Sequence, residues 1–211
     1  MHMDRRQFVK NLGLGTASLS MGSLVTASSC APSGDSSLKQ NVKEGEDGQF
    51  LFIGDDIAIA QTEYGKVQGY LLNHVYTFLG VPYGADTSGK NRFMPPQKPE
   101  PWTDVRPAVF YGNTAPQRME NRWPNNYGTF ADHWNYWDVS EDCLYLNVWT
   151  PGIADGKKRP VLVWLHGGGF TNGSGIEQDG YHGENISREG DIVFCSINHR
   201  LGPIGFSALS G

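Results

Sequence analysis

Three consecutive glycines mark the part of the chain best suited to chemistry. Residues 166–170 read His-Gly-Gly-Gly-Phe and directly follow the apolar run 160–165, Pro-Val-Leu-Val-Trp-Leu. Because glycine has no Cβ, such a run can turn sharply and bring backbone N–H groups against a ligand. N–H groups at the end of a strand can hold the developing oxyanion of acyl transfer, where one donor contributes about 2.7–4 kcal/mol. The alternatives are a merely flexible loop and a phosphate cradle, but a phosphate loop favours Lys-Ser/Thr after the glycines, and Phe170-Thr171 follows here.

The elements that must position this loop are expected to be strands of a mixed sheet. Alternating or apolar runs predict strands at 57–62, 66–71, 75–79, 144–149, 160–165 and 192–197. We expect a turn at Asn73-His74 and a short helix over 184–190 that ends at Gly190. The run 160–165 is typical of a central strand covered on both faces. Early hairpins followed by buried strands favour an α/β fold with a mixed, mainly parallel sheet.

Four further motifs accompany the glycine loop. They are Phe-Leu-Gly-Val-Pro-Tyr-Gly at 78–84, Arg-Phe at 92–93, Ser-Glu-Asp-Cys-Leu-Tyr-Leu-Asn-Val at 140–148 and Asn-His-Arg-Leu-Gly at 198–202. In this order they resemble the type-B carboxylesterase and cholinesterase family of α/β-hydrolases, from about Thr62 to the last residue. The resemblance implies the N-terminal part of an α/β-hydrolase fold, incomplete at the C-terminus, and serine-dependent hydrolysis of carboxylic esters. It assigns Gly168 and Gly169 as oxyanion donors and Phe170 as the start of a loop that lines the pocket.

The same resemblance implies a structural ion pair between Arg92 and Glu141. We expect this pair to be buried and bidentate, because a guanidinium matches a carboxylate in that geometry. The partner that the family provides for Arg200 lies beyond Gly211, so we expect Arg200 to be unpaired or to have a makeshift partner.

Two positions depart from the family pattern. Family members often pair the cysteine that matches Cys143 with an earlier cysteine, and this chain has Ala115 there. We therefore expect no such disulfide and a small, buried, apolar role for Cys143. His199 replaces the usual Tyr and is expected to pack and hydrogen-bond rather than to catalyse.

No catalytic triad is recognised in the 211 residues. In α/β-hydrolases the serine, the acid and the histidine all follow the glycine loop, and the serine stands in Gly-x-Ser-x-Gly. Ser207 comes closest to that pattern, but Leu209 occupies the position of the second glycine. We expect this chain alone to be inactive and to need neither cofactor nor metal.

The alternatives to part of an esterase are a cholinesterase-like binding or adhesion domain without a triad and a fragment that never folds. A Gly-x-Ser-x-Gly further along the coding sequence would favour the esterase.

An aromatic-rich segment gives the only hint about the substrate. Residues 118–139 carry six aromatic side chains, and Trp134 and Trp137 are candidates for contact with a small-molecule ester. Packing of this segment against the domain surface is the alternative. A net charge of -5 provides no basic stripe for nucleic acid.

The N-terminal residues resemble a targeting signal. Arg5-Arg6, followed by Phe8 and Lys10, resembles the twin-arginine export signal, and the uncharged stretch 12–27 is too short and polar to span a bilayer. We interpret residues 1–30 as a signal peptide recognised by the export machinery, with a buried helix as the alternative.

Cys30 follows Ala-Ser-Ser and resembles a lipoprotein processing site, although plain cleavage nearby would explain it equally well. The polar residues 31–48 are expected to be a flexible linker. Residues 49–211 then form the carboxylesterase-like part, which is exported and is periplasmic, secreted or anchored by lipid at the cell envelope.

Overall fold

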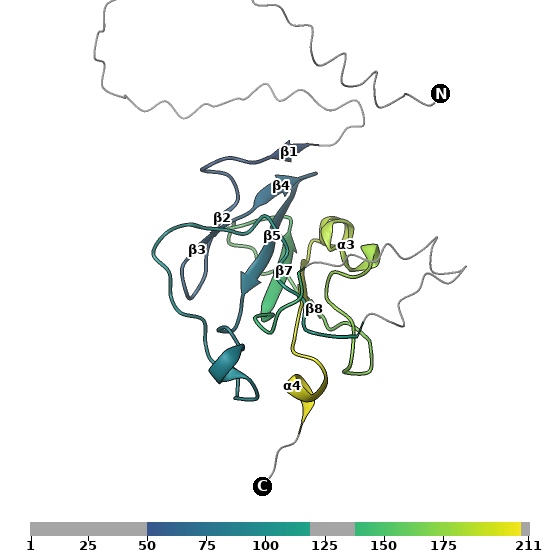
Figure 1. The fold of residues 1–211 in the computed structure, drawn as a ribbon. Coiled ribbons are helices and arrows are strands. Elements are labelled where there is room, and N and C mark those ends of the chain that lie inside the picture. Colours follow the sequence, from purple (N-terminus) through teal and green to yellow (C-terminus); the bar gives the residue numbers. More distant parts are fainter. Residues whose placement is uncertain (1–49, 119–137, 208–211) are drawn as a thin grey trace, which may run out of the picture. The chain divides into compact units, whose positions relative to one another are not determined.

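The computed structural model describes residues 50–118 and 138–207, which form two β-sheets and short helices (Figure 1). The larger sheet has the strand order β1-β4-β5-β7-β9-β8 and the smaller sheet the order β2-β3-β6. The strands are β1 (Leu51–Phe52), β2 (Ile59–Gln61), β3 (Lys66–Gln68), β4 (Tyr70–Leu72), β5 (Val75–Pro82), β6 (Arg106–Pro107), β7 (Tyr145–Thr150), β8 (Val161–Trp164) and β9 (Val193–Ile197). The helices are α3 (Glu184–Gly190), α4 (Gly202–Phe206) and the short 3-10 turns η1 (Gly89–Asn91) and η2 (Asp179–Tyr181).

The expected strands are confirmed, with one division. The run 66–71 is split at Gly69 into β3 and β4, which lie in different sheets. The turn at Asn73 and His74 is confirmed: both residues have left-handed backbones, with φ of 48° and 65°, and they join the antiparallel strands β4 and β5. Two left-handed residues give a hairpin turn whose twist matches that of its strands. The helix α3 has the predicted bounds.

The mixed α/β character is confirmed, but the balance of strand directions differs from the prediction. Among the described strands of the larger sheet, β8 and β9 are the parallel pair, and the other neighbours run antiparallel. The expectation that 160–165 is a covered central strand is wrong for the described residues. Its strand β8 lies at the edge of the sheet, with side chains 37–64% exposed. Only β9 pairs with it here, and no described layer covers its two faces.

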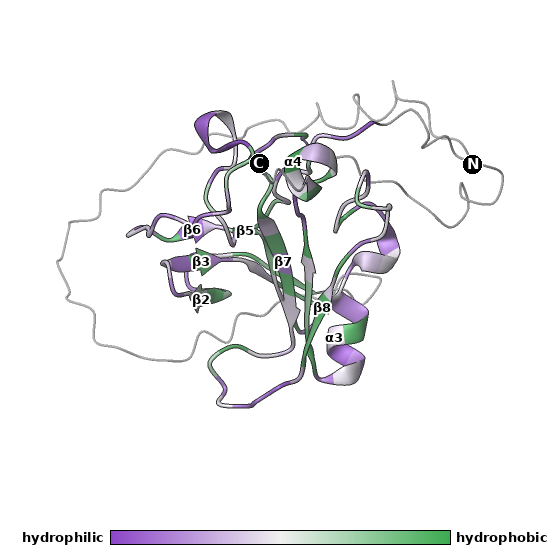
Figure 2. Cartoon of the chain, turned by 90° about the horizontal axis from the view of Figure 1, so that it is seen from below, coloured by the Kyte–Doolittle hydropathy of each residue, from purple (hydrophilic) through white to green (hydrophobic). Residues whose placement is uncertain are grey.

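The core lies on both faces of β5 and β7. Side chains alternate across a strand, so Phe78 and Val148 pack toward the smaller sheet, whereas Val75 and Trp149 face the other way. Helix α3 contacts β5, β7 and β9 and covers the second face. Its Ser187 is fully buried and donates a hydrogen bond of 3.0 Å to the carbonyl of Trp149. Figure 2 shows α3 beside the larger sheet and β2, β3 and β6 side by side in the smaller one.

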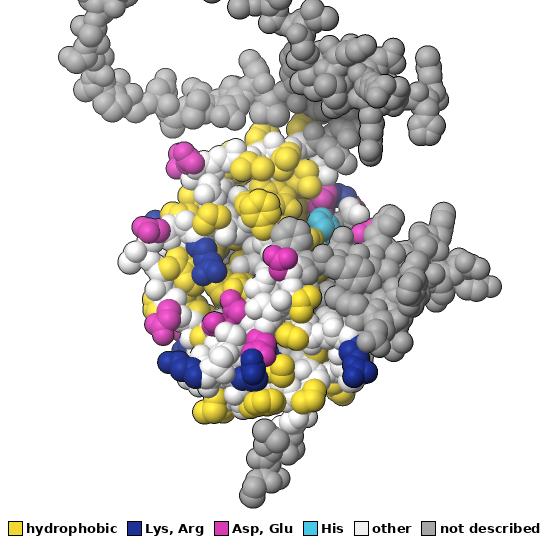
Figure 3. Space-filling view, in the orientation of Figure 1, with side chains coloured by type: hydrophobic (Ala, Val, Ile, Leu, Met, Phe, Trp, Pro, Cys, Tyr) yellow, Lys and Arg dark blue, Asp and Glu magenta, His cyan; other side chains and the backbone are white. Residues whose placement is uncertain are grey.

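Hydrophobic side chains also remain exposed over β1 and β4 (Figure 3). Leu51 and Ile53 are 56% and 63% exposed.

In the part of the chain that the structure describes, no helix has the length and apolar character needed to cross a bilayer.

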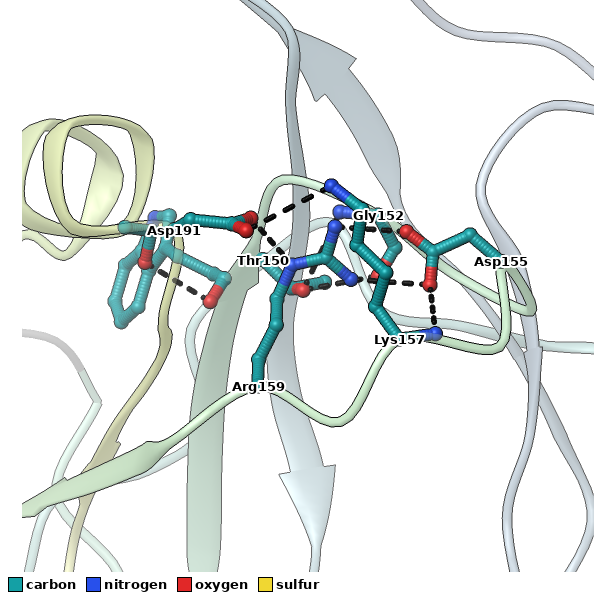
Figure 4. A network of polar contacts seen from close by, with 8 residues as sticks. Thr150, Gly152, Asp155, Lys157, Arg159 and Asp191 are labelled. Atoms are coloured by element: carbon teal, nitrogen blue, oxygen red, sulfur yellow. Dashed lines mark hydrogen bonds and ion pairs between the residues drawn. The ribbon is translucent and has the colours of Figure 1, made fainter.

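A charged network fixes the beginnings of β8 and β9 (Figure 4). The guanidinium of Arg159 binds Asp155 through two nitrogens, at 2.7 and 3.1 Å, and binds Asp191 through Nε at 2.7 Å. The Arg159 side chain is only 7% exposed. Arg159 immediately precedes Pro160 and β8, and Asp191 terminates α3 just before β9. The network therefore holds together the starts of two parallel strands.

This network predicts a loss of stability in acid. The hydrogen bonds from Arg159 lower the pKa of Asp155 to about 2 and also lower the pKa of Asp191 from its usual 3.8. A carboxyl with a depressed folded-state pKa stabilises the protein above its unfolded pKa, and this contribution is lost as the pH falls through the folded value. We expect Arg159→Gln to lower Tm at pH 7 and the difference from wild type to shrink between pH 4 and pH 2, as measured by circular dichroism.

The control for this experiment is Lys90→Gln, which removes an exposed cation that has no carboxylate partner among the described residues. It should change Tm little at any pH. A difference for Arg159→Gln that stays constant down to pH 2 would contradict the assignment.

Candidate active site

The glycine loop lies at the edge of the sheet where two strands end. Because β8 and β9 are parallel and Trp164 is in register with Ser196, the residues after both strands emerge side by side. In open α/β sheets, ligands bind at such carboxyl ends. The rings of His166 and His199 are stacked here, with centroids 4.4 Å apart and planes within 3° of parallel.

The backbone of the loop turns sharply at the glycines. Gly168 has φ of 123° and Gly169 has φ of 62°, conformations that favour glycine. The carbonyl of Gly168 accepts hydrogen bonds from the N–H groups of Thr171 and Asn172, each at 3.2 Å, which closes the turn. Within the described residues, the N–H groups of Gly168 and Gly169 donate no hydrogen bond. Two adjacent donors are thus available to a ligand.

A cavity of about 410 Å³ lies against these glycines. Its described lining is apolar apart from the loop backbone, two imidazoles and one amide: Leu165, His166, Gly167, Gly168, Gly169, Phe170, Asn172, Ile197, His199, Leu201 and Phe206. The predicted pocket residue Phe170 is one of these and is 66% exposed. A largely apolar cavity bordered by two N–H donors suits an uncharged carbonyl compound.

Two side-chain amides, of which Asn198 is buried, hold the segment that follows the loop, and both were missed as site residues. Gln117 donates to the carbonyl of Gly173 at 2.9 Å and accepts from its N–H at 2.8 Å. Asn198 is 2% exposed, accepts from the N–H of Gly175 at 2.8 Å and donates to the carbonyl of Asn113 at 3.0 Å. The available sequence signal was their place in the Pro-Gln and Asn-His-Arg segments.

The described residues contain no activated nucleophile near the loop. Burial raises the pKa of Cys143 to about 12 and that of Cys195 to about 11, so both thiols stay protonated at neutral pH. Ser174 is 3% exposed, and Ser207 is an exposed residue that follows α4. No group of three or more His, Cys, Asp or Glu side chains in the described ranges is arranged to hold a metal ion.

Cys143 has the role expected for it. It is a free thiol, fully buried, and it packs in one cluster with Ala115, Leu144 and Leu201. Arg200 has a makeshift partner, because its guanidinium donates to the carbonyl of Met94 at 2.8 Å. The predicted positions Trp134, Trp137, Arg5, Arg6 and Cys30 lie outside the described residues.

Arg92 and Glu141 form an ion pair, but the expectation of a buried, bidentate bridge is wrong. Arg92 reaches the carboxylate through Nε alone, at 2.7 and 2.8 Å from the two oxygens. Its side chain is 49% exposed. The buried link between the 84–103 loop and residue 141 comes instead from Thr87, which is 2% exposed and donates its hydroxyl to the carbonyl of Glu141. A short hydroxyl fits under the loop where a long guanidinium remains at the surface.

This geometry reverses the expected order of two substitutions. Arg92→Ala should cost at most about 1 kcal/mol of unfolding free energy, because exposed ion pairs contribute little. Thr87→Val should cost about 1–3 kcal/mol, because it removes the hydrogen bond made by a buried hydroxyl and leaves the Glu141 carbonyl without this donor. Urea denaturation of both variants decides the order, with Lys98→Ala at the exposed Lys98–Glu63 pair as the control for loss of a surface cation. A larger loss for Arg92→Ala than for Thr87→Val would contradict this account.

The comparisons with known proteins agree with this geometry. Residues 56–211 match the sequence model of the carboxylesterase family. The chain is 44% identical over 153 residues to phenmedipham hydrolase of Pseudarthrobacter oxydans, covering 72% of this chain and 30% of that protein. It is 39% identical over 155 residues to para-nitrobenzyl esterase of Bacillus subtilis (strain 168), covering 72% of this chain and 29% of that protein.

Solved structures give the same result. An esterase from Clostridium hathewayi, described as able to hydrolyse aliphatic aromatic polyesters, superposes with a TM-score of 0.68 at 38% identity, covering 77% of this chain and 31% of that one. The fold is that of part of an α/β-hydrolase. The chain belongs to the carboxylesterase family. It spans about 30% of the length of these two curated relatives.

Proposed function

We propose that this chain provides the oxyanion-binding loop of a serine hydrolase that acts on uncharged carboxylic esters. The observation that carries the proposal is the pair of N–H groups at Gly168 and Gly169, which make no hydrogen bond within the described residues and border a largely apolar cavity. When a serine oxygen attacks an ester carbonyl, the carbonyl oxygen becomes an anion, and two such donors stabilise it. Membership of the carboxylesterase family supports this chemistry.

The proposal places the nucleophilic serine, the acid and the histidine outside these 211 residues. The sequence contains no Gly-x-Ser-x-Gly, and Ser174 and Ser207 lack that context. The chain therefore contributes oxyanion stabilisation and part of the pocket wall, with Phe170 at its edge. Trp134 and Trp137 remain proposed contacts of an aryl or alkyl group.

The test compares the 211-residue chain with a longer protein that includes the coding sequence after Gly211. Hydrolysis of p-nitrophenyl acetate and covalent labelling by a fluorophosphonate report on the activated serine. We expect neither signal from the short chain and both from the longer protein, with the label on a serine in Gly-x-Ser-x-Gly. Labelling of Ser174 or Ser207 in the short chain would overturn the placement of the nucleophile. A longer protein that folds without labelling would support a binding or adhesion domain instead.

We also propose export by the twin-arginine route, on the basis of Arg5-Arg6 with Phe8 and Lys10. Replacing both arginines with lysine should leave the precursor in the cytoplasm, as seen by cell fractionation. Normal export of the Lys-Lys protein would exclude this route.

Cys30→Ser should release the exported protein from the membrane fraction if Cys30 carries a lipid.

A further inference from the structure

A continuous series of ring contacts joins the two ends of the glycine loop. His166 stacks on His199 at 4.4 Å, His199 meets Phe206 edge-on at 5.7 Å, and Phe206 lies 4.6 Å from Phe170. His166 and Phe170 flank the three glycines, whereas His199 and Phe206 belong to the segment that leaves β9 and ends α4. Rings from the segment after β9 therefore contact both ends of the glycine loop.

The two imidazoles are held in fixed orientations. Nδ1 of His166 donates to the carbonyl of Gly167 at 2.8 Å, and Nδ1 of His199 donates to the carbonyl of Arg200 at 2.9 Å. Each ring is thus tied to its own backbone, and the parallel stack transmits the position of one backbone to the other. His166 is 9% exposed, so its ring has little room to turn.

A further tie acts at the other end of the loop. The N–H of Gly202, at the start of α4, donates to the carbonyl of Phe170 at 2.7 Å. Between these ends, the glycines have no side chains that could pack and hold the loop. The ring contacts at 166 and 170 therefore act together with the backbone bonds of the turn in positioning the Gly168 and Gly169 N–H groups. Misplacement by about 1 Å can cost about 100-fold in rate.

We propose that His199 is a positioning residue, whose ring, stacked on His166 and wedged against Phe206, holds the 166–170 loop in the turn that presents its N–H groups. The expected effect of His199 on catalysis rests on the proposed function. Its role in holding the 166–170 loop does not. Any flat aromatic ring at position 199 can stack on His166, whereas a small aliphatic side chain leaves the imidazole face open.

The first experiment measures amide hydrogen exchange by NMR in the 211-residue chain. The N–H groups of Thr171 and Asn172 report the closed turn, because both donate to the carbonyl of Gly168. We expect His199→Ala to speed their exchange about tenfold or more and His199→Tyr to restore it. Amides paired between β5 and β7 should keep their wild-type rates. Phe110→Ala is the matched control, since Phe110 is 69% exposed and makes no ring contact with the residues described.

Wild-type exchange at Thr171 and Asn172 in His199→Ala would overturn the proposal. Faster exchange throughout the sheet as well would also overturn it, because that pattern indicates general destabilisation rather than local positioning. His199→Phe provides a second variant with a flat ring if His199→Tyr does not fold.

The second experiment uses the longer protein with p-nitrophenyl acetate. Positioning predicts that His199→Ala lowers kcat about tenfold or more with little change in KM, and that His199→Tyr restores kcat. An equal loss of kcat in His199→Ala and His199→Tyr would overturn the positioning role. If the wild-type protein shows no hydrolysis, the proposed function fails, and the exchange experiment alone still decides the role of His199.

Discussion

Gly168→Ala is expected to lower kcat/KM of the longer enzyme about 100-fold or more, whereas Gly169→Ala should lower it only about tenfold. A Cβ on Gly168 would lie 1.9 Å from the carbonyl oxygen of Asn172 and 2.5 Å from its Oδ1. The backbone φ of 123° is also one that side chains rarely adopt. The turn must therefore open, and the donors leave their positions.

Gly169 presents a different situation. Its φ of 62° lies in the left-handed region, which a residue with a Cβ can enter at a cost of about 1–2 kcal/mol. A Cβ there would meet nothing within 4 Å among the described residues. The N–H can remain in place in Gly169→Ala, so the expected loss is mainly strain.

Steady-state kinetics on both variants test this order. Gly89→Ala is the matched control for strain, because Gly89 has φ of 55°, equally open surroundings and a place in η1 away from the cavity. It should change stability slightly and kcat not at all. A greater loss in Gly169→Ala than in Gly168→Ala would mean that the second donor dominates and that the turn tolerates a side chain at Gly168.

Trp149→Ala is expected to destabilise the chain by about 3–5 kcal/mol, the largest effect of any single substitution considered. Trp149 is 1% exposed and packs between β5, β9 and α3, with its ring 5.9 Å from Phe194 and 5.1 Å from His182. Removing the indole leaves a cavity in the middle of the core. Since domains of this size are stable by only about 5–15 kcal/mol, much of the folding free energy would be lost.

Trp149→Phe should cost clearly less. The indole N–H of Trp149 is buried without a hydrogen-bond partner in the described part of the chain, so phenylalanine removes volume but no hydrogen bond. Trp164→Ala is the control for loss of a tryptophan, because Trp164 lies on the edge strand β8 and is 37% exposed. Urea denaturation of the three variants gives the comparison. Equal losses for Trp149→Ala and Trp164→Ala would contradict the placement of the core on β7.

The acid-sensitive network at Arg159 shows how distant sequence segments support the candidate site. Asp155, Arg159 and Asp191 fix the starts of β8 and β9, and the opposite ends of these strands carry His166 and His199. None of the three stood out in the sequence, because single charged residues in turns and at helix ends are ordinary. Only the parallel pairing of β8 with β9 brings Arg159 to Asp191.

Local sequence determined the features that depend on neighbouring residues. The hairpin turn at Asn73-His74, the helix that ends at Gly190 and the tight turn at Gly168 and Gly169 follow from backbone preferences over a few residues. The position of the glycine turn directly after its strand β8 also followed from the sequence. These inferences required no knowledge of what lies across the sheet.

Tertiary structure alone decided exposure, strand neighbours and ring contacts. The apolar run at β8 is an edge strand in the described residues, Arg92 lies at the surface while Thr87 is buried, and the run 66–71 divides between two sheets. The stack of His166 on His199 also required the parallel register of β8 and β9. Apolar periodicity records how a residue is suited to burial, but burial itself depends on which distant segments pack there. For this reason the sequence by itself determined the glycine turn after β8, and only the fold decided which distant side chains contact that turn.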